Sequence, residues 1–179
     1  MRKQKFIQKS LFLLMVGFGL LLFTSCSNDD DGNSSANQTI SFRVNLVKIK
    51  ATDTSGEGNA ANNELEIFGE LSASLSLGTT VDLRELWSAD ADNYISVGQN
   101  DSQLTGETTF TIAANQLNTS VITCSGDLME WDGVTDFEDQ GTSSASFALA
   151  TITGTQEFDL TFSETVGQTC VVTFSITRL

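Results

Sequence analysis

Apolar and polar residues alternate along most of the chain from Thr39 onward, with the period of two that is typical of half-buried β-strands. From Ile40 to Leu46 every second residue is apolar. The apolar positions then shift to Val47 and Ile49, which predicts a β-bulge. The clearest strand covers residues 65–77. Further strands are predicted over residues 81–87, 94–97, 108–113, 120–125, 145–152, 157–162 and 169–177.

Segments rich in Gly, Asn, Asp and Ser separate these strands, and at most one helical turn is expected, near residues 115–117. Many short strands at this spacing predict an all-β fold, a single antiparallel β-sandwich of about eight strands. The chain contains no proline, so charges and bulges must guard the edges of its sheets.

The first 26 residues have a different pattern. Four basic residues precede an unbroken apolar run over residues 11–23, which ends in Thr24-Ser25-Cys26. This arrangement is typical of a secretory signal and is too short to span a membrane. It resembles the signal peptide and lipobox of bacterial lipoproteins, which implies cleavage after residue 25 and a lipid anchor on Cys26. The expected organisation is a signal peptide over 1–25, a flexible acidic tether over 26–38 and a β-sandwich over 39–179.

Residues 27–38 contain no apolar side chain larger than alanine, so this segment cannot bury surface and is expected to be a flexible tether. Its triplet Asp29-Asp30-Asp31 resembles the acidic export signal of Bacteroidetes lipoproteins. That resemblance implies display on the outer face of the outer membrane, and retention on the periplasmic face is the alternative.

The charge balance excludes some classes of partner. The chain holds nine basic and 23 acidic residues, for a net charge of −14. Residues 1–25 hold four of the basic residues and no acidic one, so their removal lowers the net charge to −18. Such a protein repels nucleic acid and anionic lipid, so we expect no nucleic-acid partner. Membrane association is expected only through the lipid anchor.

Histidine is absent, which removes Ser-His-Asp and Cys-His nucleophile systems and most catalytic zinc sites. Carboxylate chemistry remains possible, but no spacing singles out a catalytic pair. We therefore expect the protein not to be an enzyme.

The segment 126–141 is the richest in acidic residues, with six carboxylates in thirteen positions. Unneutralised carboxylates at this density repel one another, and Ca²⁺ takes six to eight oxygen ligands of this kind. The spacing does not fit an EF-hand loop. The hypotheses are a calcium site and, alternatively, a solvated acidic surface.

This segment also resembles the third calcium loop of the calcium/phospholipid-binding β-sandwich found in protein kinase C and synaptotagmin. Glu130-Trp131-Asp132 takes the place of that family's Asp-x-Asp motif, and residues 47–53 resemble its first strand and first loop. Asn63-Glu64 stands where the family has Asp-Pro, and the family's basic strand patch is missing. The resemblance implies a Greek-key sandwich. The candidate metal ligands are Asp53, Asp127, Glu130, Asp132, Asp136 and Asp139.

Two cysteines remain if Cys26 carries lipid. Cys124 and Cys170 both share the parity of apolar neighbours and are expected to face the core. In an oxidising compartment they are predicted to form a disulfide, and the alternative is two buried reduced thiols.

Three aromatic residues are candidates for stacking on sugar rings: Trp87, Tyr94 and Trp131. The alternative is that they fill the core beside a polar turn at residues 90–93.

These observations predict a lipid-tethered, non-catalytic binding or accessory module with an unidentified protein or glycan partner. Calcium is the candidate stabilising ion. Two other classes stay open: a structural subunit of a cell-surface complex and a small carboxylate-dependent glycan hydrolase.

Overall fold

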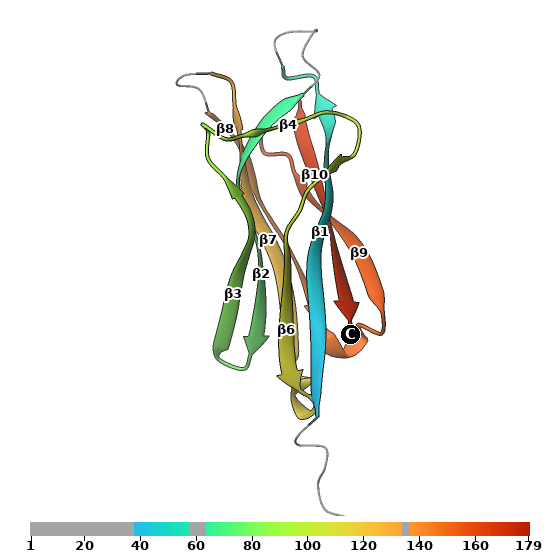
Figure 1. Cartoon of the computed structure of the whole chain (residues 1–179). Helices are drawn as coiled ribbons and strands as arrows, with labels where there is room; N and C mark the ends of the chain where they lie inside the picture. The colour runs from blue at the N-terminus through green and yellow to red at the C-terminus, as the bar shows by residue number, and fades with distance from the viewer. Residues whose placement is uncertain (1–37, 58–63, 134–136) are drawn as a thin grey trace, which may run out of the picture. The chain divides into compact units, whose positions relative to one another are not determined.

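The structure is a computed structural model that describes residues 38–57, 64–133 and 137–179. Ten strands and two short 3-10 turns make up the described part (Figure 1). The strands are β1 (Thr39–Thr54), β2 (Leu65–Leu77), β3 (Thr80–Ala89), β4 (Ile95–Val97), β5 (Ser102–Gln103), β6 (Glu107–Ala113), β7 (Ser120–Trp131), β8 (Phe137–Ala148), β9 (Thr155–Phe162) and β10 (Gln168–Arg178). The turns are η2 (Ala114–Gln116) and η3 (Leu149–Thr151).

All strand pairs are antiparallel and form two sheets. In the first sheet, β1 and β9 flank β10, and β5 and β6 share the outer edge of β1. In the second sheet, β2 and β8 flank β7, and β3 and β4 share the outer edge of β2. The ten strands therefore occupy eight positions, four in each sheet, which confirms the predicted antiparallel sandwich of about eight strands.

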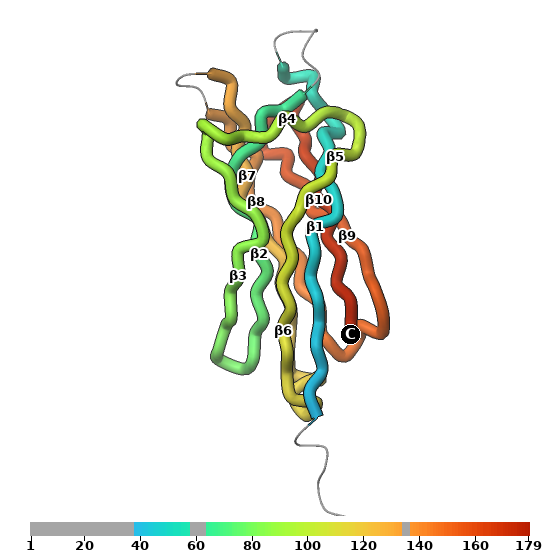
Figure 2. Tube along the Cα trace, viewed as in Figure 1, coloured from blue at the N-terminus to red at the C-terminus, as the bar shows by residue number. Residues whose placement is uncertain are grey.

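The chain passes repeatedly between the two sheets, as its trace shows (Figure 2). Hairpins join β2 to β3, β7 to β8 and β9 to β10, whereas the connections β1–β2, β4–β5, β6–β7 and β8–β9 cross from one sheet to the other. After β3 and β6, the chain returns to the second sheet and places β7 beside β2, which is the return connection of a Greek key.

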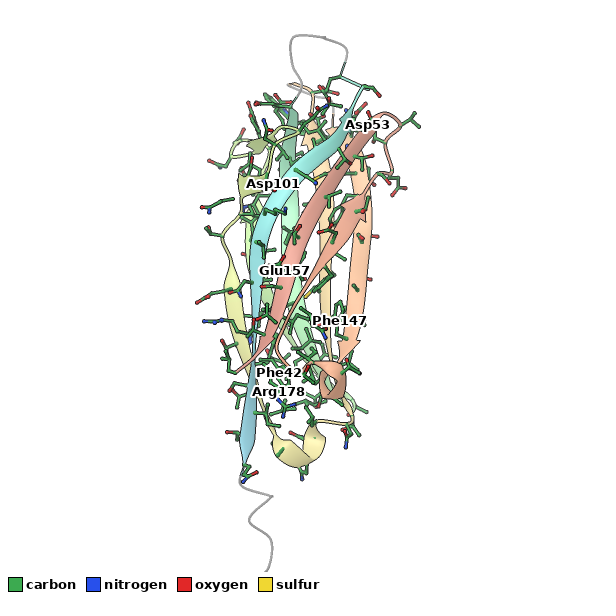
Figure 3. The ribbon with its side chains drawn as sticks, turned by 90° about the vertical axis from the view of Figure 1, so that its right-hand side faces the viewer. Phe42, Asp53, Asp101, Phe147, Glu157 and Arg178 are labelled. Atoms are coloured by element: carbon green, nitrogen blue, oxygen red, sulfur yellow. The ribbon has the colours of Figure 1, made fainter. Side chains whose placement is uncertain are left out.

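Strand β1 runs from one end of the sandwich to the other. Its register with β10 shifts between Leu46 and Lys48, which confirms the predicted bulge at Val47. Figure 3 shows Phe42 and Arg178 near one end, with Asp53 at the opposite end. Strands β1 and β7 both finish at the Asp53 end (Figure 1).

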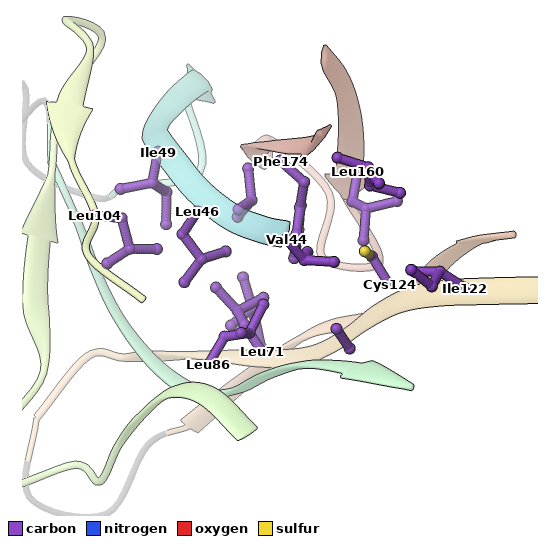
Figure 4. Packing of buried hydrophobic residues seen from close by; sticks show 14 of the residues in the cluster. Val44, Leu46, Ile49, Leu71, Leu86, Leu104, Ile122, Cys124, Leu160 and Phe174 are labelled. Atoms are coloured by element: carbon purple, nitrogen blue, oxygen red, sulfur yellow. The ribbon is translucent and has the colours of Figure 1, made fainter. Parts of the chain in front are cut away.

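Apolar residues of the predicted parity fill the space between the sheets (Figure 4). Four phenylalanines are fully buried there, at positions 42, 110, 162 and 174. Burial of this kind of surface is the main favourable term in folding. The sheets are therefore held together by a continuous apolar layer.

The predicted disulfide is not formed: Cys124 and Cys170 are buried free thiols. Cys124 belongs to β7 in one sheet and Cys170 to β10 in the other. Facing sheets pack about 10 Å apart, whereas the Cα atoms of a disulfide are usually about 4.4–6.8 Å apart. Both side chains pack as small apolar groups, and burial raises the pKa of each thiol to about 12.

The predicted signal peptide, the tether and Cys26 lie outside the described residues, apart from Gln38. In the part of the chain that the structure describes, no helix is long and apolar enough to cross a membrane.

Candidate metal centre

Three carboxylates converge at the end of the sandwich where β1 and β7 finish. Glu57 follows β1, Glu130 is the second-last residue of β7, and Asp132 follows that strand. One carboxylate oxygen from each lies within 4.8 Å of those of the other two. With Ca–O distances of about 2.3–2.6 Å, two ligands of one ion are at most about 5 Å apart. The three side chains can therefore bind a single cation.

Glu130 reaches this position because β7 continues beyond its predicted end. Alternate residues of β7 face the core, including Ile122, Cys124 and Leu128, and Glu130 continues that series. Its side chain has an exposed fraction of 0%. The acidic segment is thus not a free loop but the paired ends of β7 and β8, and strand parity divides its acids between two faces.

The carboxylate of Glu130 is only partly satisfied by the protein. The backbone N–H of Glu66 donates a hydrogen bond to its Oε1 over 3.1 Å. Its Oε2 is buried and has no hydrogen-bond partner among the described residues. Burial raises the pKa of Glu130 to about 8, and the nearby charges of Asp132 and Glu57 contribute to the rise. An orphaned buried oxygen of this kind is costly unless a ligand satisfies it.

Glu57 is held by a chain of two buried glutamines. Gln168 donates a hydrogen bond from Nε2 to Oε1 of Glu57 over 2.9 Å, and the Nε2 of Gln140 donates to Oε1 of Gln168. Gln140 is the extra residue where the register of β7 and β8 shifts. The backbone N–H of Gly56 also donates to the carbonyl of Gly167, so the segment after β1 is fixed to the β9–β10 connection.

Within residues 38–57, 64–133 and 137–179, no basic side chain forms an ion pair with the three carboxylates. The ion pairs of these ranges are Lys48 with Asp101 and Arg84 with Asp82. Burial raises the pKa of Glu57, with further contributions from the charges of Asp132 and Glu66. The site is therefore negative, partly dehydrated and formed by oxygen ligands, which is the chemistry that suits a hard divalent cation.

Of the predicted ligands, the structure brings Glu130 and Asp132 together. Asp127 and Asp139 are exposed, at positions where the strand pairing places them on the outer face of the sheet. Asp53 accepts a hydrogen bond from the backbone N–H of Ser55 over 3.0 Å, and this bond lowers the pKa of Asp53. Asp136 lies outside the described residues.

The candidate stacking residues lie in two places. Trp87 packs against the core. Tyr94 and Trp131 stack on each other, with ring centroids 5.0 Å apart and an interplanar angle of 29°. Both are half-buried.

Sequence reasoning did not identify Glu57 as a ligand. The one signal for it was its place soon after Asp53, in the segment that resembles a first calcium loop. Its partners Gln140 and Gln168 carried no signal, because amide side chains are common on strand surfaces.

No protein-family model matches the chain. No characterised protein matches it by sequence. Among solved structures, a C2 domain of plant extended synaptotagmin 1 is 12% identical, with a TM-score of 0.43, and the match covers 78% of this chain and 93% of that one.

Human GIVD cytosolic phospholipase A2 is 11% identical with a TM-score of 0.42, and the match covers 82% of this chain but only 17% of the enzyme. A C2 domain protein from Ramazzottius varieornatus is 11% identical with a TM-score of 0.37, covering 79% and 89% of the two chains. These are likenesses of backbone arrangement.

Proposed function

We propose that the protein is a non-catalytic binding module whose end segments are held together by a divalent cation, calcium, bound by Glu57, Glu130 and Asp132. The observation that carries this proposal is the buried, unpartnered Oε2 of Glu130 beside two further carboxylates. A cation supplies the missing partner for that oxygen and removes the repulsion among the three acids.

The cation also has a structural task. Glu57 follows β1 in one sheet, whereas Glu130 and Asp132 belong to the β7–β8 hairpin of the other sheet. A shared ion joins the two sheets at an end where no described ion pair does so. This supports a role in fixing the loops of a binding module.

The same carboxylates support a catalytic role less well than a cation site. A general acid must reach its substrate, but Glu130 is completely buried. Two surface cavities lie elsewhere, one lined by residues 45–47 and 103–107, the other by residues 88–90 and Asn93. Neither includes Glu57, Glu130 or Asp132.

We further propose that the module is exported and anchored through a lipid on Cys26, on the outer face of the outer membrane. The support is in the sequence: the apolar run over 11–23, the cysteine that follows small residues, and the acidic triplet at 29–31.

Thermal unfolding of the purified full-length protein in calcium and in EGTA tests the cation site. Binding to the folded state alone stabilises a protein by about 2.7 kcal/mol at about one hundred times Kd. For a domain of this size that corresponds to a rise in Tm of roughly 5–10 °C. Glu130→Gln should abolish the rise, whereas the exposed control Glu107→Gln should retain it. A Tm that is the same in millimolar calcium and EGTA would contradict the proposal.

A further inference from the structure

A second charged surface lies on the outer face of β2, β7 and β8, near the same end of the sandwich. Register pairing places Phe68 opposite Met129, and Trp131 opposite Phe137. Phe68 and Phe137 contact each other edge to face, with centroids 5.6 Å apart. Their neighbours along the strands, such as Ile67 and Leu128, are buried in the core. Because successive residues of a strand point to opposite faces, these side chains face away from the core.

Acidic residues alternate with these aromatic ones on the same outer face. Glu70 pairs with Asp127 in the register of β2 and β7, and Asp139 pairs with Met129 across β7 and β8. We call this surface the acid–aromatic face and define it by Phe68, Glu70, Asp127, Trp131, Phe137 and Asp139.

The acid–aromatic face is accessible. Phe137 has an exposed fraction of 48%, which is high for a phenylalanine, and the three acids are exposed. Phe68 and Trp131 are half-buried beside Phe137. A large aromatic side chain that remains exposed next to charged groups, as Phe137 does, is typical of an interaction site.

The strands that form this surface carry no positive charge. The sequences of β2, β7 and β8 contain no lysine or arginine. The five basic residues of the described part belong to the other strands β1, β3 and β10. The acid–aromatic face therefore combines aromatic side chains with carboxylates, and its strands contain no basic residue.

We propose that the acid–aromatic face docks a cationic segment of a partner protein in which arginine or lysine alternates with large apolar residues. Guanidinium groups pair with carboxylates and also stack on aromatic rings, so arginine uses both kinds of group present here. Apolar side chains of the segment cover Phe137 and its aromatic neighbours. A neutral sugar leaves the three carboxylates unused, and an anionic lipid is repelled by them.

Fluorescence anisotropy of a labelled, end-capped peptide of alternating arginine and leucine tests this proposal on the purified full-length protein. The measurement is made in EGTA and in calcium, so that loss of the cation site is distinguished from loss of the docking surface. We expect this peptide to bind at least about tenfold more tightly than an arginine–serine peptide of equal charge, because only its leucines can cover the aromatic side chains. A tenfold difference in Kd corresponds to about 1.4 kcal/mol.

Substitutions test whether the peptide binds at the acid–aromatic face. Phe137→Ser and the pair Asp127→Asn with Asp139→Asn should each weaken binding by about tenfold or more. The matched control is the pair Glu157→Gln with Asp159→Asn on β9, in the other sheet, which should leave binding unchanged. Equal binding of the two peptides, or equal loss in the control, would show nonspecific charge attraction and overturn the proposal. Binding of cellohexaose that depends on Phe137, without peptide binding, would assign the surface to a glycan and overturn it too.

Discussion

Gln168 donates a hydrogen bond from its Nε2 to Oε1 of Glu57 over 2.9 Å, and it accepts one from Gln140 at its own Oε1. Gln168 and Gln140 are both buried. This amide chain fixes the direction of the Glu57 carboxylate from behind, as hydrogen bonds behind a metal ligand commonly do.

Replacing Gln168 by methionine removes that support while it keeps the side-chain volume. We expect calcium affinity to fall by roughly 10–100-fold, the usual effect of losing a residue that orients a ligand. The free energy of unfolding in EGTA should fall by about 1–3 kcal/mol, because Gln140 is left without its acceptor. Calorimetric titration with calcium measures the affinity, and Gln103→Met on the surface is the control. Unchanged affinity in Gln168→Met would show that Glu57 does not depend on this amide.

The buried Glu130 makes stability depend on pH in the absence of a cation. Its pKa of about 8 in the folded protein lies above its ordinary value of 4.5. Between these values the folded state holds a proton that the unfolded state has lost, so stability falls as pH rises from 4.5 to about 8. The slope approaches about 1.4 kcal/mol per pH unit. Urea unfolding in EGTA at several pH values measures it.

Glu130→Gln should weaken the fall in stability with rising pH. Saturating calcium should weaken it too, because the ion stabilises the ionised carboxylate. A wild-type decline that persists unchanged in Glu130→Gln would assign the effect to other groups.

The two core thiols should be unreactive in the folded protein. Burial and a pKa of about 12 keep Cys124 and Cys170 protonated and out of reach of solvent. In a Cys26→Ser protein, a thiol reagent at mildly alkaline pH should modify neither cysteine until urea unfolds the domain, and then both. If the unfolded protein reacts with the thiol reagent only after reduction, Cys124 and Cys170 are joined by a disulfide, and this prediction is wrong.

Gly69 is placed where β2 passes close to the backbone of β7. Its φ of +125° is in a region that L side chains rarely adopt, and a Cβ atom there would overlap the carbonyl oxygen of Asp127. Gly69→Ala should destabilise the protein by roughly 2–4 kcal/mol, from backbone strain and overpacking together. Gly154→Ala is the matched control, because nothing lies within 4 Å of a Cβ atom at that position. Equal urea midpoints for the two variants would contradict this account.

The lipid anchor has a direct test in the cell. In detergent phase separation the wild-type protein should enter the detergent phase, because each buried CH₂ of an acyl chain contributes about 0.8 kcal/mol. Cys26→Ser should leave the protein in the aqueous phase, and Ser27→Ala should behave as wild type. Equal partitioning of the cysteine variant would exclude acylation at Cys26.

Period-two alternation is enough to predict the sandwich, because both of its sheets have one face in the core. It also predicts the bulge at Val47. It is less informative in the acidic segment, where the density of carboxylates suggests a loop. The parity continues there, since Leu128 and Glu130 extend the core series of Ile122 and Cys124. A charged residue in a sequence usually indicates an exposed position. Because Glu130 is charged but buried, the pattern does not reveal where β7 ends.

The cation site depends on tertiary placement that one strand cannot reveal. Glu57 follows β1 of one sheet and lies beside Glu130, near the end of β7 in the other sheet, and Gln168 comes from a third segment. Asp127 and Glu130 are close in sequence but lie on opposite faces of β7, so their proximity in sequence does not bring their carboxylates together.

Strand β1 has one more consequence. It holds 16 residues, which at about 3.3 Å per residue span roughly 50 Å. It starts at the end of the domain that adjoins the tether and finishes beside Glu57. The cation cluster and the acid–aromatic face therefore lie at the far end of the domain from Thr39, the first residue of β1, separated from it by nearly the whole length of this strand.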